Sequence, residues 1–223
     1  KVEDKLRDVL GDSFPEKPAD PRWADVTVEH AICHRTGLPG GHLDIDCAPY
    51  RSFGDDFLAY CFATPLEYDP GTDEKYADGS TYLVSRIVAA ASGETLDRFL
   101  WKNLLDKMDF GELAWSCDPD GHPIGATGLH IHSEDLVKLP YLYMKGGVYK
   151  DVRLLSEEWC SRVLEKQYVF EPNETGEFYF KGGMYGQKMV LIPAFGVAFA
   201  EQSFHADSGK IADFVLDYLK KHA

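Results

Sequence analysis

The stretch from Phe178 to Pro193, FYFKGGMYGQKMVLIP, places a lysine and two glycines between an aromatic segment and an apolar one. Such segments, separated by glycines, are typical of two antiparallel strands joined by a short connection. Lys181 can point its ammonium group into a cleft, while Gly182 and Gly183 leave room for a ligand against the backbone. The alternative is a hairpin or bulge that needs glycine only for its own geometry. The stretch predicts a sheet edge and leaves both interpretations of its glycines open.

The spacing of apolar residues predicts several helices before this stretch and one after it. We expect helices over 1–12, 27–34, 81–91, 96–105, 134–143, 156–166 and 209–221, and strands over 178–180, 187–192 and 196–202. Thr27, Ser80, Ser133 and Ser156 are the expected N-caps, and Gly93 is the expected stop of the helix before it. These elements predict an α+β fold, with an antiparallel sheet, packed helices and an α-rich lobe.

Length and composition favour one globular domain. The chain has 223 residues, of which 44% are hydrophobic, enough for a substantial core. We expect a single domain over 1–223, with a mainly helical lobe over approximately 27–166 and sheet strands plus a C-terminal helix over 176–223. The formal charge of −14 argues against a nucleic-acid or anionic-membrane partner, because both need basic patches.

The location of the protein is predicted from what the sequence lacks. It contains no apolar run of about 18 residues that could span a membrane, and no hydrophobic core of a signal peptide. The cysteines are odd in number and include no C-x-x-C pair, which is typical of reduced thiols. They are Cys33, Cys47, Cys61, Cys117 and Cys160. We therefore expect a cytoplasmic protein.

Upstream segments carry a resemblance to a known superfamily. TVEHAICHRTGL (27–38) resembles the family segment T-V-R-H-L-L-T-H-T-S-G-L, and Tyr76-Ala77-Asp78 stands where the family has Y-x-N before a helix. Residues 111–159 are similar to the family's next loop and helix, and Lys181-Gly182-Gly183 looks like its K-T-G element. The chain thus resembles the serine β-lactamase and penicillin-binding-protein-like superfamily, in particular its class C and esterase-like branch, and a β-lactamase/transpeptidase-like fold is implied.

The resemblance implies catalytic roles for Tyr76, Asp78 and Lys181. In this family the Y-x-N tyrosine is assigned general-base work, which needs cationic neighbours because a phenol ordinarily ionises near a pKa of about 10. Asp78 replaces an asparagine and, when ionised, can only accept hydrogen bonds. The alternative for Tyr76 is a packing aromatic before a helix. Asp78 could instead pair with Lys181.

The family's K-T-G element also implies residues that bind substrate. By position these are Gly182, Gly183 and Tyr185. Gly182 stands where the family has a hydroxyl residue that helps to bind a carboxylate. An ester or peptide-like substrate is therefore favoured over a β-lactam.

The family's nucleophile motif, S-x-x-K, is absent from the chain, because no serine is followed by a lysine three residues later. The resemblance places that motif, an N-terminal helix and the first strands of the sheet before Lys1. The chain is then an N-terminally incomplete domain, a shortened homologue without hydrolase activity, or one that another chain completes. An incomplete sheet exposes an edge that must be covered or paired.

Histidines offer a competing interpretation as a metal site. His130 and His132 alternate, with Asp135 close behind, and alternate residues of a strand share a face that could bind zinc. His30 and His34 lie four apart in an expected helix but lack the glutamate between them that the metalloprotease motif requires. We favour structural roles for these histidines and expect neither a metal nor a cofactor.

Two functions follow from these patterns. The first is a β-lactamase-like serine hydrolase that cleaves a small-molecule or peptide-like ester or amide through an acyl-enzyme, inactive with these residues alone because the nucleophile is missing. The second is a non-catalytic binding or interaction module derived from that fold. Fold by itself does not select a substrate.

Overall fold

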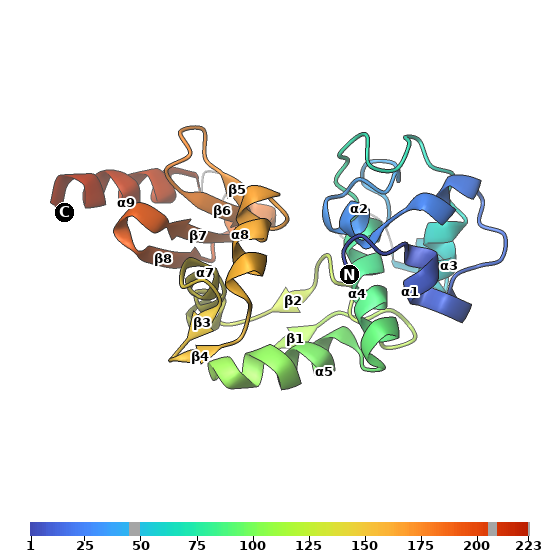
Figure 1. The fold of residues 1–223 in the computed structure, drawn as a ribbon, viewed down its shortest axis with the longest axis horizontal. Helices are drawn as coiled ribbons and strands as arrows, with labels where there is room; N and C mark the ends of the chain where they lie inside the picture. Colours follow the sequence, from blue (N-terminus) through green and yellow to red (C-terminus); the bar gives the residue numbers. More distant parts are fainter. Residues whose placement is uncertain (45–49, 205–208, 223) are drawn as a thin grey trace. The chain divides into compact units, whose positions relative to one another are not determined.

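A computed structural model describes residues 1–44, 50–204 and 209–222 of the chain (Figure 1). Its backbone contacts divide it into two compact units. The first unit contains residues 1–107 and 113–130, and the second contains 108–112 and 131–223. The α+β class predicted from the sequence is confirmed, because helices and an antiparallel sheet both occur.

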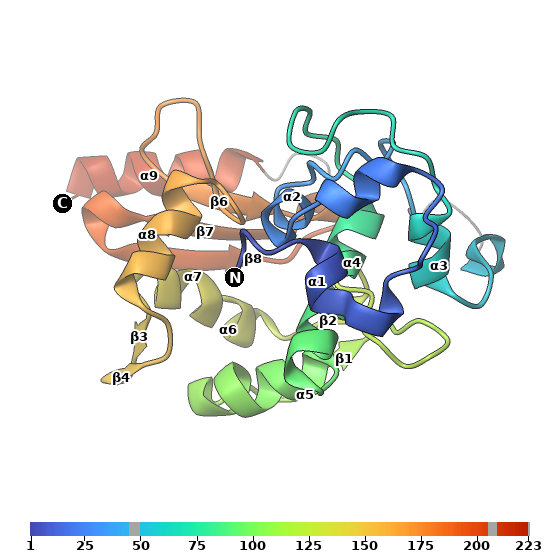
Figure 2. The same ribbon diagram turned by 45° about the vertical axis from the view of Figure 1, so that its right-hand side comes forward.

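The first unit is built around one long helix, α4. Its helices and strands are α1 (Leu6–Leu10), α2 (Val28–Ile32), α3 (Phe57–Phe62), α4 (Asp78–Ser92), α5 (Leu96–Leu100), β1 (Ala114–Trp115) and β2 (Leu129–His130). Short 3₁₀ turns cover Gly11–Ser13, Pro21–Asp25, Tyr50–Phe53 and Asp106–Met108, and a π-helical turn covers Trp101–Leu105. Helix α4 contacts α1, α2, α3 and α5, and Figure 2 shows α1 and α2 beside it.

Large apolar side chains fill the core of this unit. Trp23, Phe57 and Tyr82 are almost completely buried, and the rings of Trp23 and Phe62 lie edge to face, 4.9 Å apart. The aromatic residues of α3 therefore pack the core. Burial of such rings is a main source of folding free energy.

The second unit places a four-stranded antiparallel sheet between helices. Its helices and strands are α6 (Ser133–Leu136), α7 (Lys138–Met144), β3 (Val148–Tyr149), β4 (Val152–Arg153), α8 (Glu157–Glu165), β5 (Glu171–Pro172), β6 (Tyr179–Gly182), β7 (Lys188–Ile192), β8 (Val197–Glu201) and α9 (Gly209–His222). Further 3₁₀ turns cover Met184–Gly186 and Pro193–Phe195. The strand order is β5-β6-β7-β8, and β3 and β4 form a separate hairpin.

The two faces of the sheet are covered by different helices. Phe178, Val190 and Ile192 pack against Ala212 and Leu216 of α9. Helix α7 contacts β7 and β8 and lies on the other side of the sheet from α9 (Figure 1). Because side chains alternate along a strand, the residues that do not face α9 lie on the face that α7 covers. This face carries Lys181, because its neighbour Phe180 belongs to the α9 side.

Several expected helix ends differ from the structure. Thr27 and Ser156 cap α2 and α8, as predicted, and Gly93 ends α4 in a left-handed conformation with φ of 73°. Ser80 and Ser133 are not caps. Helix α4 begins at Asp78, and the Ser80 hydroxyl pairs with the Thr36 hydroxyl at 3.1 Å instead.

The expected helix over 134–143 is divided into α6 and α7. Pro140 has no N–H to donate to the carbonyl of Leu136, so the ladder is interrupted near Val137. The Ser133 hydroxyl, the expected cap, donates to Oε1 of Gln202 at 2.5 Å.

Two structural observations concern the features from which the location was predicted. Within the described part of the chain, no helix is both long and apolar enough to cross a bilayer. Cys33, Cys61, Cys117 and Cys160 form no disulfide there, and Cys47 lies outside the described residues.

Candidate active site

Tyr76 lies in the extended segment that leads into α4, with 58% of its surface exposed. Backbone hydrogen bonds hold this segment on both sides. The carbonyl oxygen of Tyr76 accepts from the Gly41 N–H at 2.9 Å, and the Lys75 N–H donates to the carbonyl oxygen of His34 at 2.9 Å. The backbone at Tyr76 is therefore fixed, while the phenol ring reaches solvent, as suits a reactive group on a rigid scaffold.

His34 contacts this segment with its ring as well. The imidazole stacks on the phenol ring of Tyr76 with centroids 4.7 Å apart and planes 28° apart. Its Nδ1 accepts a hydrogen bond from the Ala77 N–H at 3.3 Å. The sequence predicts that His34 is the last residue of a helix over 27–34, but it lies outside the helix. Helix α2 ends at Ile32, and His34 has a left-handed φ of 53°.

Asp78 is the first residue of α4 and is 4% exposed. It therefore lies on the first helical turn, and not on the turn before the helix as its sequence position suggests. A carboxylate is favoured here because the first N–H groups of a helix carry partial positive charge. Its side chain is held in the protein interior one residue beyond Ala77.

A buried histidine supports the start of α4. The Nε2 atom of His42 lies 2.9 Å from the Thr64 hydroxyl, which itself donates to the carbonyl oxygen of Tyr60. The hydroxyl proton is thus used, so His42 donates from Nε2 and its Nδ1 is an acceptor. Burial lowers the pKa of His42 to about 4, and Nδ1 has no hydrogen-bond partner among the described residues.

Gly79 allows this close contact. A Cβ atom at position 79 would lie 2.5 Å from Nδ1 of His42. The Gly79 N–H also donates to the carbonyl oxygen of His42 at 3.1 Å. The glycine that follows Asp78 thus lets the helix begin directly against the imidazole.

Lys181 lies on β6 of the second unit, opposite Met189 of β7, and is partly exposed. Gly182 and Gly183 follow it. A Cβ atom at Gly182 would meet nothing within 4 Å, whereas one at Gly183 would lie 3.2 Å from the Cβ of Gln187. The space beside Gly182 is what the ligand interpretation of this position requires, and Gly183 is explained by the packing of the turn.

Tyr185 lies in the turn after β6, with a left-handed φ of 60° and 55% exposure. Its ring lies 4.6 Å from that of Phe204, which is 82% exposed. Left-handed backbone is unusual for an aromatic residue and often occurs at binding sites. The sequence reasoning missed Phe204, because it is distant along the chain and has no periodic signal.

The histidines do not form a metal site in the described ranges. No group of three or more histidine, cysteine, aspartate or glutamate side chains there is arranged to hold an ion. His30 accepts from the Thr27 N–H through Nδ1 in the capping box of α2, and burial lowers its pKa. His130 lies on β2, and His132 precedes α6.

The predicted site residues divide between the two units. Tyr76 and Asp78 belong to the first, and the segment from Lys181 to Tyr185 belongs to the second. Within the first unit, the structure adds His34 and Gly41 beside Tyr76, and His42 beside the start of α4. The sequence signal for His34 is its spacing of four from His30, a pattern that suggests metal binding and gives no sign of a contact with Tyr76.

A sequence model of the Beta-lactamase family matches residues 2–149. The chain belongs to the Beta-lactamase family. The match includes Tyr76-Ala77-Asp78 and ends before Lys181. The superfamily resemblance predicted from the motifs is thereby confirmed.

The chain is similar to a known hydrolase and to penicillin-binding proteins. The 6-aminohexanoate-dimer hydrolase of Paenarthrobacter ureafaciens is 29% identical over 119 residues, which is 51% of this chain and 30% of that protein. The octameric penicillin-binding protein homologue from Pyrococcus abyssi has a TM-score of 0.69 and 20% identity, over 99% of this chain and 60% of that one. The penicillin-binding protein from Bacillus halodurans has a TM-score of 0.65 and 20% identity, over 95% and 79%.

These comparisons establish the fold of the Beta-lactamase family over nearly the whole chain. The chain covers less than two thirds of the length of the Paenarthrobacter and Pyrococcus relatives. It is thus a member of a hydrolase family that shares the fold of penicillin-binding proteins.

Proposed function

We propose that this chain forms most of a serine hydrolase that cleaves an ester, amide or peptide-like substrate through an acyl-enzyme. Tyr76, Asp78 and Lys181 are the proposed catalytic residues, and Gly182, Gly183 and Tyr185 the proposed substrate-binding residues. The observation that carries the proposal is the fixed but exposed Tyr76, set before α4 in the place of the family's Y-x-N motif. No cofactor is needed for this chemistry.

The proposed reaction begins at a serine oxygen, which attacks the carbonyl carbon of the substrate. Tyr76 accepts the serine proton, and the alcohol or amine leaves after receiving a proton. Water then attacks the acyl-enzyme, releases the acid and restores the serine. An ionised phenol requires a nearby positive charge, because a cation lowers the pKa of an acid. Lys181 is proposed as a catalytic residue from its place in the family's K-T-G element.

The nucleophile is proposed to come from outside these 223 residues, since no serine of the chain has a lysine three positions later. It would be supplied by another segment of the same polypeptide or by a second chain. Two features of the second unit support an added segment. Among the described strands, β8 pairs only with β7, which leaves its other edge open.

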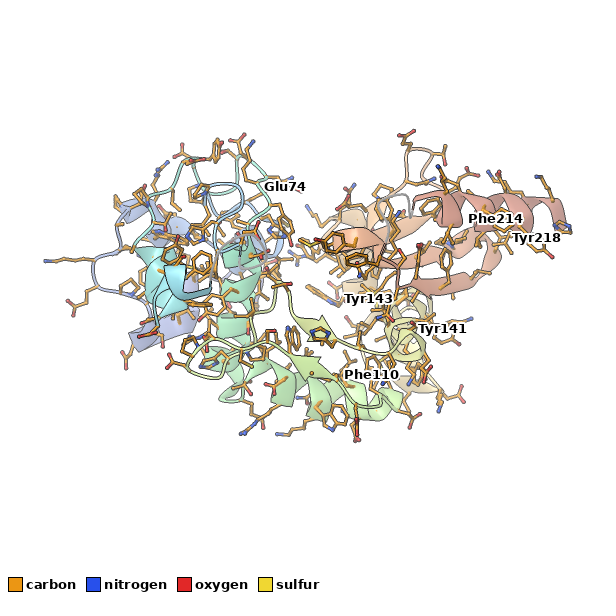
Figure 3. The ribbon with its side chains drawn as sticks, turned by 180° about the vertical axis from the view of Figure 1, so that it is seen from behind. Glu74, Phe110, Tyr141, Tyr143, Phe214 and Tyr218 are labelled. Carbon is orange, nitrogen blue, oxygen red and sulfur yellow. The ribbon has the colours of Figure 1, made fainter. Side chains whose placement is uncertain are left out.

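The second feature is an apolar stripe on α9. Ile211, Phe214 and Tyr218 are 46%, 69% and 53% exposed, and their spacing places them on one side of the helix. Figure 3 shows Phe214 and Tyr218 projecting from α9. An edge strand and an exposed aromatic stripe are surfaces that proteins usually cover.

A non-catalytic binding module is the second candidate. It is favoured by Asp78, which is 4% exposed and stands where the family has an asparagine. An ionised carboxylate cannot donate a hydrogen bond to a substrate carbonyl. Saturable binding of a peptide or cell-wall fragment without turnover would support this candidate, and rapid turnover would eliminate it.

Intact mass spectrometry with a fluorophosphonate, which labels an activated serine, tests the first proposal. The protein is isolated from its own cells and measured before and after labelling. We expect a mass above the 25.0 kDa of this chain and one covalent adduct. Digestion should locate the adduct on a serine followed by lysine three residues later. A mass of 25.0 kDa with no adduct on this chain or on any chain that co-purifies with it would overturn the proposal.

A further inference from the structure

The exposed phenol ring of Tyr76 needs support that burial does not provide. More than half of its surface is in contact with solvent. An exposed tyrosine ordinarily samples several rotamers, and a catalytic group that is displaced by about 1 Å loses on the order of 100-fold in rate. The contacts that limit its motion are therefore functionally important.

His34 touches all three residues of the segment 75–77. Its carbonyl oxygen accepts from the Lys75 N–H, its ring stacks on Tyr76, and its Nδ1 accepts from the Ala77 N–H. The stack restricts rotation of the phenol ring, and the two hydrogen bonds fix the backbone that carries it. We infer that His34 is a positioning residue that holds the Tyr76 hydroxyl for the reaction; the catalytic part of this inference rests on the proposed function.

The position of His34 is itself fixed by hydrogen bonds between two loops. The Gly71 N–H donates to the carbonyl oxygen of Arg35 at 2.8 Å, and the Glu67 N–H donates to that of Gly37 at 2.8 Å. Arg35 also pairs with Glu74, labelled in Figure 3, at 3.2 Å. The loop that carries His34 is therefore bonded along its length to the loop that leads to Tyr76.

The hydrogen bond to Ala77 defines the tautomer of the imidazole. Nδ1 can accept from an N–H only when it carries no proton, so the neutral ring holds its proton on Nε2. A phenyl ring would preserve the stack and lose the acceptor, with some loss of stability because position 34 has a left-handed φ of 53°. An asparagine would keep an acceptor and tolerate the left-handed backbone, but it would lose the stack.

These two replacements separate positioning from a general structural role. We would label the tyrosines of the chain with 3-fluorotyrosine and assign the Tyr76 ¹⁹F resonance with Tyr76→Phe. We expect His34→Asn to leave the unfolding midpoint unchanged and to shift and sharpen the Tyr76 resonance toward that of a mobile tyrosine. We expect His34→Phe to preserve the linewidth of this resonance and to shift the Ala77 amide resonance upfield. An unchanged Tyr76 resonance in a folded His34→Asn would overturn the inference. A Tyr76 resonance that is as sharp in His34→Phe as that of a mobile tyrosine would also overturn it.

Turnover of the complete enzyme then tests the catalytic consequence. We expect His34→Asn to lower kcat about 10- to 100-fold with KM changed less than threefold, and His34→Phe to retain more of the rate. The control is His130→Asn on exposed β2, with unchanged kcat. An unchanged kcat in His34→Asn would overturn the catalytic role. A wild-type enzyme without turnover would instead refute the proposed function, while the ¹⁹F spectra would still decide whether His34 holds Tyr76.

Discussion

The Tyr82 hydroxyl donates a 2.6 Å hydrogen bond to Oδ2 of Asp118 inside the first unit, where both residues are buried. Arg86 completes the cluster, with its NH1 atom 2.9 Å from the Tyr82 oxygen and 3.3 Å from the Asp118 carboxylate. Burial, followed by the bond to Asp118, raises the pKa of Tyr82. The cluster ties the segment after β1 to α4, the helix that carries Asp78 on its first turn.

Asp118→Asn should destabilise the chain by about 3 kcal/mol, because it leaves the largely buried Arg86 cation without its carboxylate. Tyr82→Phe should cost about 1–2 kcal/mol, since one hydrogen bond to a charged acceptor is lost. The free energy of unfolding in urea measures both effects. The matched control is Asp120→Asn at an exposed position, expected within about 0.5 kcal/mol of the wild type. Equal effects at 118 and 120 would contradict the role of the cluster.

His42 should make the stability depend on pH. An unfolded histidine binds a proton near its ordinary pKa of 6.5, whereas buried His42 stays neutral down to about 4. The unfolded state therefore binds more protons in this window, and stability falls as the pH decreases from 6.5 to 4. The contribution lost is about 3 kcal/mol, at 1.36 kcal/mol per pKa unit.

Removing the imidazole isolates this effect from the titration of carboxylates. We expect His42→Gln to be less stable than the wild type at pH 7, with a difference that narrows as the pH approaches 4. Unfolding free energies in urea at several pH values measure it. A difference that stays constant with pH would show that His42 does not titrate as its burial indicates.

Gly37→Ala should be one of the most damaging small substitutions in the first unit. Gly37 has a φ of 94°, and a Cβ atom there would lie 2.4 Å from the carbonyl oxygen of Tyr68. Gly93 has a φ of 73° but open space around it. We expect Gly93→Ala to cost about 1 kcal/mol from backbone strain and Gly37→Ala about 3 kcal/mol or more, because the collision is added. Similar losses of unfolding free energy would contradict the packing at Gly37.

Local patterns predicted the elements that depend on local contacts. Apolar stretches predict β7 and β8, helical spacing predicts α9, and the caps at Thr27 and Ser156 form as expected. These features depend on neighbours a few residues away. Sequence periodicity is therefore enough to find them.

The candidate site depended on contacts that sequence spacing does not reveal. Helix α4 starts at Asp78 and not at the predicted Thr81. At this helix start, the Gly79 N–H donates to the carbonyl oxygen of His42, and the Tyr76 carbonyl oxygen accepts from the Gly41 N–H. Nδ1 of His34 accepts a hydrogen bond from the Ala77 N–H, although the two residues are 43 positions apart in the sequence. Motif resemblance predicts Tyr76 and Asp78 as site residues, whereas the residues that contact them are seen only in the folded chain.

Gly182 offers a direct test of substrate binding at β6. A methyl group at this position meets nothing within 4 Å, so Gly182→Ala should keep the fold and change the unfolding free energy by less than about 1 kcal/mol. If substrate lies against this backbone, the methyl group occupies its place. We expect the rate constant for fluorophosphonate labelling, and kcat/KM for a p-nitrophenyl ester, to fall about 10-fold or more in the complete enzyme. Gly40→Ala, also at an open position without a left-handed φ, is the control and should leave both rates unchanged. Unchanged rates in Gly182→Ala would contradict substrate binding against this backbone.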